Sequence, residues 1–241
     1  MTTETMHKLA ARDSKGKVVC LVSGGIDSPV AAWLFVKMGY EPIFAYFDNN
    51  PLSDETTKRR AFESMSKVMR HWPNATAKVY VIPHGENLMD VITKCPRKLT
   101  CILCRRFMFR VAERIATAEG AHAIVTGEIL GEHASQTLYN LASISSATRL
   151  PILRPLIGMN KVEVEQLARK IGTFDISTKP ASCCRGAPKQ PRTKSKMDEV
   201  LSAENRLDTE TMTERAFKAS KIETITSFCD QDVSGVAEMP T

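Results

Sequence analysis

Six residues near the start of the chain have the types and spacing of an anion site, in the string Ser23-Gly24-Gly25-Ile26-Asp27-Ser28. Two adjacent glycines let the backbone turn sharply and leave no side chains between the main chain and a ligand. The apolar run 18–22 before the loop predicts a buried strand, and the run 29–36 after it predicts a buried helix. Unpaired N–H groups at the helix start favour phosphate, although an ordinary strand–turn–helix connection has similar residues.

Polar residues at two later points have the right types to complete such a site. Thr126, Gly127 and Glu128 end an apolar run that predicts a strand, and Gln136 follows at an expected helix start. Lys161 begins another expected helix, where its ammonium group would add positive charge to an anion site. On spacing alone, turn and cap hydrogen bonds explain Glu128 and Gln136 equally well, and a solvated helix end explains Lys161.

Thiols are the third group of residues with chemical potential. Cys101 and Cys104 are three residues apart on an expected helix, so they share one face and can together hold a metal ion or cluster. Cys183 and Cys184 supply further thiols, and the adjacent Arg185 would lower the pKa of a thiol there. A single Cys-x-x-Cys is a weak signal, so zinc, a disulfide pair and simple core packing remain alternatives.

Lysines and arginines cluster on both sides of these thiols. A charge run is usually a solvated face, yet both runs flank the expected reaction centre. We therefore expect contacts with phosphates and a steep dependence on salt. The residues expected to contact RNA are Arg105, Arg106, Lys189, Arg192 and Lys194.

Strands that alternate with helices must position these groups. The sequence predicts strands at 18–22, 41–47, 78–83, 121–126 and 150–153. It predicts longer helices at 53–71, 100–119 and 160–171 and a later one at 209–221. Ser28 is expected to cap the first helix, and Asn160 and Glu163 form a capping box. This alternation predicts an α/β fold with a doubly wound, parallel, five-stranded sheet, in which the loops after the strands converge on one site.

The whole chain has the composition of a globular protein. It has 241 residues, of which 43% are hydrophobic and 25% charged, and its net charge of +6 permits a nucleic-acid partner. No apolar run is long enough to span a bilayer, so we expect a cytoplasmic protein without a membrane partner. We expect a loose leader at 1–16, a nucleotide-binding domain at 17–176, and a basic, cysteine-bearing extension with a helix and tail at 177–241.

Three motifs together resemble a known family. The string at 23–28 resembles the SGGxDS loop of the ATP pyrophosphatase (PP-loop) superfamily. The segments 126–141 and 154–161 are similar to the TGExxGQxxSQTLxNL and RPLIxxDK motifs of the tRNA 4-thiouridine synthases, which are thiamine-biosynthesis-linked tRNA uridine sulfurtransferases. Glu132 stands where that family usually has Gln, and Asn160 where it usually has Asp. The resemblance covers about residues 17 to 200.

The resemblance implies an adenine nucleotide α-hydrolase-like fold that uses ATP and Mg²⁺. It implies that the loop at 23–28 holds pyrophosphate and that Asp27 lies near the metal and phosphates. Asp27, Lys161 and one of Cys183 and Cys184 are the expected catalytic residues. The expected ATP-binding residues are Ser23, Gly24, Gly25, Asp27, Ser28, Tyr46, Phe47, Thr126, Gly127, Glu128 and Gln136.

Related sulfurtransferases imply two interpretations of the thiols. In the first, Cys101, Cys104 and one of Cys183 and Cys184 hold a [4Fe-4S] or [3Fe-4S] cluster whose open iron binds sulfide. In the second, the string Pro180-Ala181-Ser182-Cys183 resembles the spacing at which a cysteine attacks a persulfide, and Cys184 follows directly.

The resemblance implies an ATP-dependent sulfurtransferase that adenylates a tRNA uridine and replaces its O4 by sulfur. We expect tRNA as a partner, with sulfide or a persulfide donor such as a cysteine desulfurase. We do not expect the family's N-terminal RNA-binding modules or rhodanese domain in this chain, so a separate RNA-binding subunit and a homodimer are further expectations. The alternatives are a small-molecule or carrier-protein acceptor, and a nucleotide-binding module without turnover.

Overall fold

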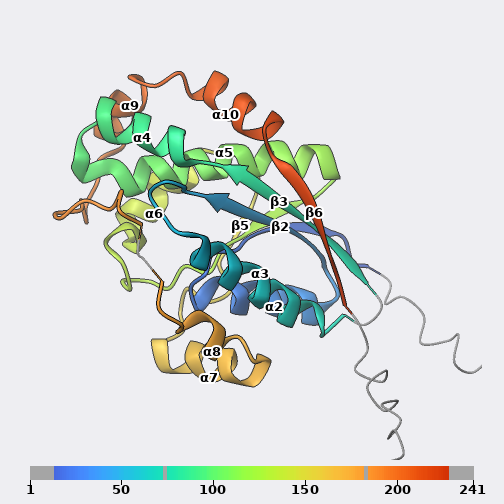
Figure 1. Cartoon of the computed structure of the whole chain (residues 1–241). Helices are drawn as coiled ribbons and strands as arrows, with labels where there is room; N and C mark the ends of the chain where they lie inside the picture. Colours follow the sequence, from blue (N-terminus) through green and yellow to red (C-terminus); the bar gives the residue numbers. More distant parts are fainter. Residues whose placement is uncertain (1–13, 73–74, 182–183, 228–241) are drawn as a thin grey trace, which may run out of the picture.

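Six strands form one sheet through the middle of the protein, in the computed structural model that describes residues 14–72, 75–181 and 184–227 (Figure 1). The strand order is β5-β4-β1-β2-β3-β6. The first five strands run parallel, and β6 pairs antiparallel with β3. The strands are β1 Lys17–Leu21, β2 Glu41–Asp48, β3 Thr76–Pro83, β4 Ala123–Val125, β5 Ile152–Leu153 and β6 Lys221–Thr226.

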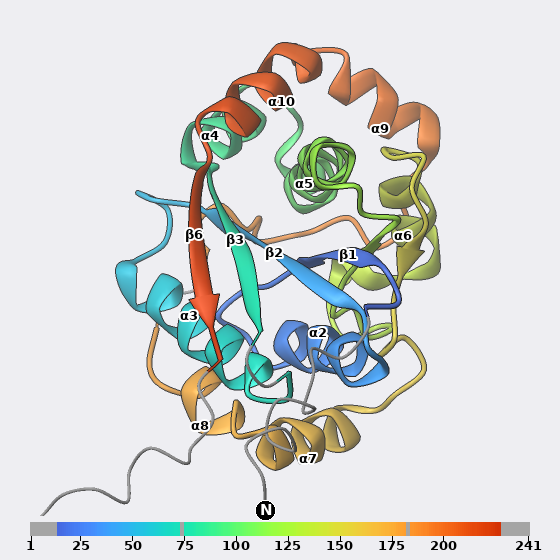
Figure 2. The same ribbon diagram turned by 90° about the vertical axis from the view of Figure 1, so that its right-hand side faces the viewer.

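Helices cover both faces of this sheet (Figure 2). One layer contains α2 Asp27–Met38, α3 Glu55–Met69, α7 Lys161–Ile171 and α8 Phe174–Ser177. The other contains α4 Gly85–Lys94, α5 Thr100–Glu119, α6 Leu138–Ser145, α9 Met197–Glu204 and α10 Thr209–Lys218. None of the helices in the described parts of the chain is long and apolar enough to cross a membrane.

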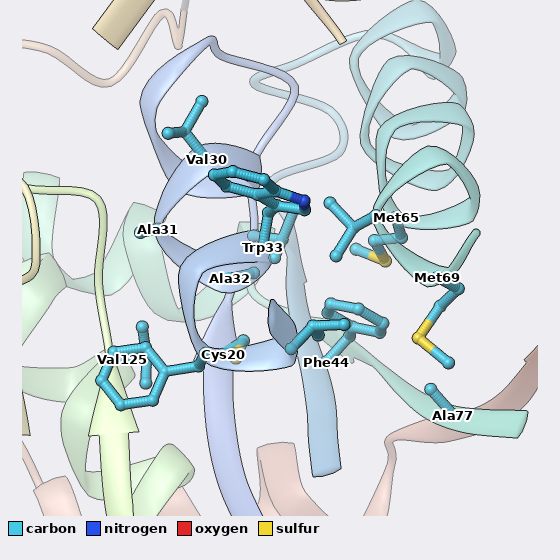
Figure 3. Close-up of a cluster of buried hydrophobic side chains, with 14 of the residues drawn as sticks. Cys20, Val30, Ala31, Ala32, Trp33, Phe44, Met65, Met69, Ala77 and Val125 are labelled. Atoms are coloured by element: carbon cyan, nitrogen blue, oxygen red, sulfur yellow. The ribbon is translucent and has the colours of Figure 1, made fainter. Parts of the chain in front are cut away.

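Alternate residues of each central strand face opposite layers, which produces two hydrophobic cores. Cys20 of β1 and Phe44 of β2 lie in the core under α2 and α3, where Trp33 and Met65 join them (Figure 3). Val19 of β1 belongs to the other core, which packs on α5. Because the central strands are buried on both faces, they have continuous apolar sequences, which is typical of a parallel sheet.

The structure confirms the doubly wound α/β fold and its five parallel strands, but the prediction of a five-stranded sheet was wrong. Residues 221–226 add a sixth strand at the β3 edge. Only Ile225 of this strand is buried, so its sequence lacks the apolar run that identified the others. The preceding helix also ends at Lys218, three residues earlier than predicted, which leaves these residues free to pair.

Candidate active site

The loop after β1 is closed by its own serines. Ser28 Oγ accepts a hydrogen bond of 2.9 Å from the Ser23 backbone N–H and lies 3.1 Å from Ser23 Oγ. α2 begins at Asp27 after Ile26, and no side chain caps it. The expected helix cap at Ser28 is therefore wrong, because its hydroxyl is used within the loop. The first-turn N–H groups of α2 are left without a side-chain cap and so remain suited to an anion.

The loop after β4 packs directly against this loop. A Cβ atom on Gly127 would lie 2.6 Å from Ser28 Cα, so only glycine allows this approach. β1 lies between β4 and β2 in the sheet. The chain leaves β1 toward β2 on one side and leaves β4 toward β5 on the other, so the two connections diverge at the carboxyl ends of β1 and β4. Ligands of open α/β sheets bind at such a crevice beside the carboxyl ends of the strands.

A pocket of about 370 Å³ opens at this crevice. Two buried acceptors on its wall, Asn49 Oδ1 and Gln136 Oε1, have no hydrogen-bond partner among the described residues. Buried polar atoms are rarely left unpaired, so these two oxygens point to a polar ligand. The lining includes Ser23, Gly25, Asp27, Ser28, Asn49, Cys101, Cys104, Arg105, Thr126, Gly127, Gln136 and Cys184.

Lys161 reaches the phosphate loop from the start of α7. Its Nζ lies 2.8 Å from Asp27 Oδ1 and 3.4 Å from Glu132 Oε1. Asn160 and Glu163 form the predicted capping box, which fixes the point at which Lys161 leaves the helix. Burial alone would lower the pKa of Lys161, but the hydrogen bond and charge of Asp27, with Glu132, raise it above its ordinary value. Lys161 is therefore a firmly charged cation beside the loop.

Glu128 lies outside this pocket, contrary to its expected contact with the nucleotide. Its buried carboxylate accepts hydrogen bonds from Arg105 at 2.8 Å, from Thr126 Oγ1 at 3.0 Å and from Arg154. Two arginines balance the desolvated charge, as a buried carboxylate requires. Arg105 itself lines the pocket, so Glu128 positions a cation there and does not face the ligand.

Tyr46 and Phe47 also face away from the pocket. Tyr46 is buried in the core on the α3 side, and Phe47 is buried in the core on the α5 side. The loop that follows β2 does reach the site, but through Asn49. The prediction that this loop converges on the site is correct. Asn49 itself was not predicted, because one asparagine in a turn cluster has no distinguishing sequence signal.

Three thiols among the described residues line the same pocket: Cys101, Cys104 and Cys184. Burial raises the pKa of Cys104 to about 12, and burial with the neighbouring Cys184 raises that of Cys101. Cys104 Sγ lies 3.1 Å from Nε2 of His84. Burial lowers the pKa of His84 to about 4, so its ring is neutral at physiological pH.

The fit of these thiols to an iron–sulfur cluster depends on residues that include Cys183. Within residues 14–72, 75–181 and 184–227, no three His, Cys, Asp or Glu side chains are placed to hold a metal ion. Cys183 lies outside the described residues, so its expected roles as catalyst and ligand have no structural account. Cys101, Cys104 and Cys184 line one cavity.

Several of the arginines expected to contact RNA are paired with carboxylates instead. Arg106 is buried and forms a two-pronged ion pair with Glu204, so its assignment to an RNA surface is wrong. Arg192 pairs with Glu199 at 2.6 Å. Arg105 is held by Glu128, as described above. The sequence could not reveal these pairs, because each partner is brought close only by the fold.

Exposed basic residues nevertheless line a groove of about 770 Å³ beside the pocket. Arg97, Arg185 and Lys189 are exposed on its walls, and Ala187 lines both the groove and the pocket. Lys194 lies farther along the same segment, with its Nζ 4.6 Å from the centre of the exposed Tyr139 ring. Lys189 and Lys194 are therefore the expected RNA contacts that the structure leaves accessible.

Residues 13–209 match the family model of the thiamine biosynthesis protein ThiI. The chain belongs to the ThiI family. A probable tRNA sulfurtransferase from Methanosarcina mazei is 43% identical over 209 residues, which are 87% of this chain and 52% of that protein. A second, from Caldanaerobacter subterraneus subsp. tengcongensis, is 41% identical over 197 residues, or 81% and 51% of the two chains. This chain thus spans about half the length of these ThiI-family relatives.

Solved structures agree with this family and with the fold. A 4-thiouridine synthetase in complex with RNA and bound ATP superposes with a TM-score of 0.83 at 39% identity, covering 87% of this chain and 55% of that one. An NMN synthetase from Francisella tularensis superposes with a TM-score of 0.54 at 16% identity, covering 86% and 87%. At that identity the second likeness concerns the fold alone.

Proposed function

We propose that this chain is the catalytic part of an ATP-dependent tRNA sulfurtransferase that converts a uridine to a 4-thiouridine. The single observation that carries the proposal is that the phosphate loop and three thiols line one pocket. An activated oxygen and an incoming sulfur must meet within one site, and a pocket lined by both a phosphate loop and thiols supports such a reaction. The tRNA sulfurtransferase names of the relatives and the RNA and ATP of the solved synthetase support the same reaction.

The first step is the attack of the uridine O4 on the α-phosphorus of ATP. The uridine gives up its N3 proton, the α–β phosphoanhydride bond breaks, and pyrophosphate leaves into the loop at 23–28. Asp27 would hold Mg²⁺, because no described residue bonds its Oδ2 and the carboxylate lines the pocket. Mg²⁺ supplies charge neutralisation on the phosphates. Lys161 beside Asp27 stabilises the negative charge that develops on the α-phosphate oxygens.

The second step replaces the adenylated oxygen by sulfur. Hydrosulfide attacks C4, the C4–O bond breaks, and AMP leaves with the former O4. If sulfur arrives as a persulfide on Cys184, its outer sulfur attacks C4 and AMP leaves. A second thiol such as Cys101 then attacks Cys184 Sγ, so that the S–S bond breaks, the thiouridine is released and a disulfide forms, which an added dithiol must reduce. A cluster on Cys101, Cys104 and Cys183 or Cys184 would instead supply an iron that carries sulfide.

The groove beside the pocket is the proposed path of the RNA backbone. Arg97, Arg185 and Lys189 supply positive charge for phosphates. Ala187 lines both this groove and the pocket that contains the thiols, so the groove and the pocket adjoin. A uridine that leaves the RNA stack at this point can enter the pocket. Paired arginines such as Arg106 have no part in this path.

The test is a reaction with anaerobically purified protein, ATP, Mg²⁺, sulfide and bulk tRNA. We expect AMP, pyrophosphate and thiolated tRNA nucleoside in equal amounts, measured by chromatography and mass spectrometry. ATP that binds without forming AMP would contradict the proposal and favour a module without turnover. AMP formed only when a carrier protein or small acceptor replaces tRNA would favour the alternative acceptor.

A further inference from the structure

Arg60 connects two segments that the proposed reaction must bring together. It lies on α3, outside the pocket, and its guanidinium donates hydrogen bonds to the carbonyl oxygens of Gly24, Ser177 and Lys179, the last at 2.9 Å. Gly24 belongs to the phosphate loop, and Ser177 and Lys179 belong to the segment that leads to Cys184. Arg60 is thus bonded simultaneously to the loop that holds phosphate and to the chain that carries a thiol.

These contacts fix the orientation of the phosphate loop. Ser177 Oγ donates to the Gly25 carbonyl at 3.2 Å, so both glycine carbonyls of the loop are held from outside the pocket. A peptide unit is planar, and its carbonyl and N–H point in opposite directions. Holding the carbonyls of Gly24 and Gly25 therefore fixes the N–H group of Gly25, which donates to Ser23 Oγ at 3.2 Å, and that of Ile26, which directly precedes α2.

The cysteine-bearing segment is anchored at two more points, one on the same helix and one just before it. Lys179 Nζ forms an ion pair of 2.8 Å with Glu63 of α3. The Arg185 backbone N–H donates to the Leu52 carbonyl at 3.0 Å, just before α3. The described parts of the segment are therefore held near α3 at Ser177, Lys179 and Arg185, and Cys184 lines the pocket beside the last of these contacts.

We propose that Arg60 is a positioning residue that couples occupancy of the phosphate loop to the order of the cysteine-bearing segment. The inference rests on the proposed function, because the coupled events are nucleotide binding and sulfur delivery. A charged donor shared among neutral carbonyls forms strong hydrogen bonds with defined directions. Movement of the loop around a bound phosphate is thereby transmitted through the guanidinium to Ser177 and Lys179.

The test measures hydrogen–deuterium exchange of the amides at 175–181 with and without saturating ATP and Mg²⁺. These amides are informative because none of these residues lines the pocket, so direct shielding by the nucleotide does not explain a change. In the unaltered chain we expect ATP to slow their exchange by about tenfold. In Arg60→Gln we expect the dissociation constant of ATP to rise by about tenfold and the ATP response at 175–181 to disappear at saturation.

Matched variants separate coupling from simple loss of structure. Lys170→Gln is the control for the loss of one positive charge, because Lys170 is exposed on α7 away from these contacts, and it should keep both properties. Arg60→Lys retains a charged donor and should restore part of the ATP response, and Ser177→Ala should weaken it without removing the guanidinium. Thermal denaturation identifies any variant that fails to fold, and Arg60→Lys and Ser177→Ala then carry the test.

Each remaining outcome is decisive. If ATP binds the unaltered chain but leaves exchange at 175–181 unchanged, the coupling is wrong while the proposed function stands. A folded Arg60→Gln variant that keeps the full ATP response also overturns the coupling. If the unaltered chain binds no ATP, the proposed function itself fails.

Discussion

Individual residues at the phosphate loop are held by partners that come from distant parts of the chain. Lys161 contacts Asp27 across 134 residues of sequence and also reaches Glu132. Burial lowers the pKa of Lys161, but Asp27 and, to a smaller extent, Glu132 raise it, and the net result is a pKa above the ordinary value. The ammonium group therefore stays charged to a higher pH than an ordinary lysine.

Replacing Lys161 with Met should lower the rate of AMP formation by about 100-fold, because one charged group that stabilises the reacting phosphate is lost. The rate is measured in single turnover with saturating ATP and tRNA. Lys170→Met is the control, since Lys170 is exposed on the same helix. Equal rates for Lys161→Met and the control would contradict a role of Lys161 in stabilising the reacting phosphate.

Gly127 tests the contact between the two loops. Gly127→Ala would place a Cβ atom 2.6 Å from Ser28 Cα, so the loops must separate, and we expect ATP affinity to fall by at least about tenfold. Gly158→Ala is the matched control, because no atom lies within 4 Å of its added Cβ. Titration calorimetry measures both, and unchanged affinity in Gly127→Ala would contradict the proposed nucleotide site.

The sequence predicted the residues that follow strand ends better than the directions of their side chains. Thr126, Gly127 and Gln136 line the pocket as the loop positions implied. Glu128 and Arg106 do not face a ligand, because each forms an ion pair with another side chain. Glu128 pairs with Arg154, 26 residues away in sequence, and Arg106 pairs with Glu204, 98 residues away. A charged residue beside a motif has the same sequence signal whether its partner is a ligand or another side chain.

Among the elements, the central parallel strands were predictable as continuous apolar runs, and the long helices because each buries an apolar face at helical spacing. α5 spans Thr100–Glu119 as the sequence predicted. β6 was missed because a single buried residue, Ile225, attaches an otherwise exposed strand to the core. Its pairing with β3 is stabilised mainly by backbone hydrogen bonds, which leave no pattern in the side chains.

Ile225 should be the residue that secures β6 to the sheet. Ile225→Ala is expected to lower the free energy of unfolding by about 2 kcal/mol, because the buried side chain leaves a cavity on the α3 side. Ile222→Ala on the same strand is the control, since Ile222 is 55% exposed and should change stability by less than about 0.5 kcal/mol. Urea denaturation measures both, and equal losses would contradict this account of the edge strand.

For the molecule as a whole, the fold gathers basic residues from separate segments into one groove at the thiol end of the pocket. Arg97 precedes α5, whereas Arg185 and Lys189 come after Cys184 in the sequence. The net charge of +6 is modest, so the distribution of charge matters more than its sum. The sequence predicted the basic runs, but only the structure separates exposed residues from those paired with Glu199 and Glu204.

Replacing both Arg185 and Lys189 with Gln should weaken tRNA binding and reduce its salt dependence. Each phosphate contact contributes a slope of about 0.9 in the logarithmic plot of affinity against salt, so the double variant should lose up to about two units. Lys170→Gln with Lys218→Gln is a control of equal charge at exposed positions. An unchanged slope in the first variant would contradict the proposed path of the RNA.

The central claim is that a uridine oxygen is adenylated in the pocket that also delivers sulfur. A tRNA transcript labelled with ¹⁸O at the uridine O4 positions tests it most directly, in the presence of ATP, Mg²⁺ and sulfide. We predict one ¹⁸O atom in AMP for each 4-thiouridine formed, detected by mass spectrometry. AMP that contains only unlabelled oxygen would contradict the claim, because the adenylated oxygen would then have come from water or another acceptor.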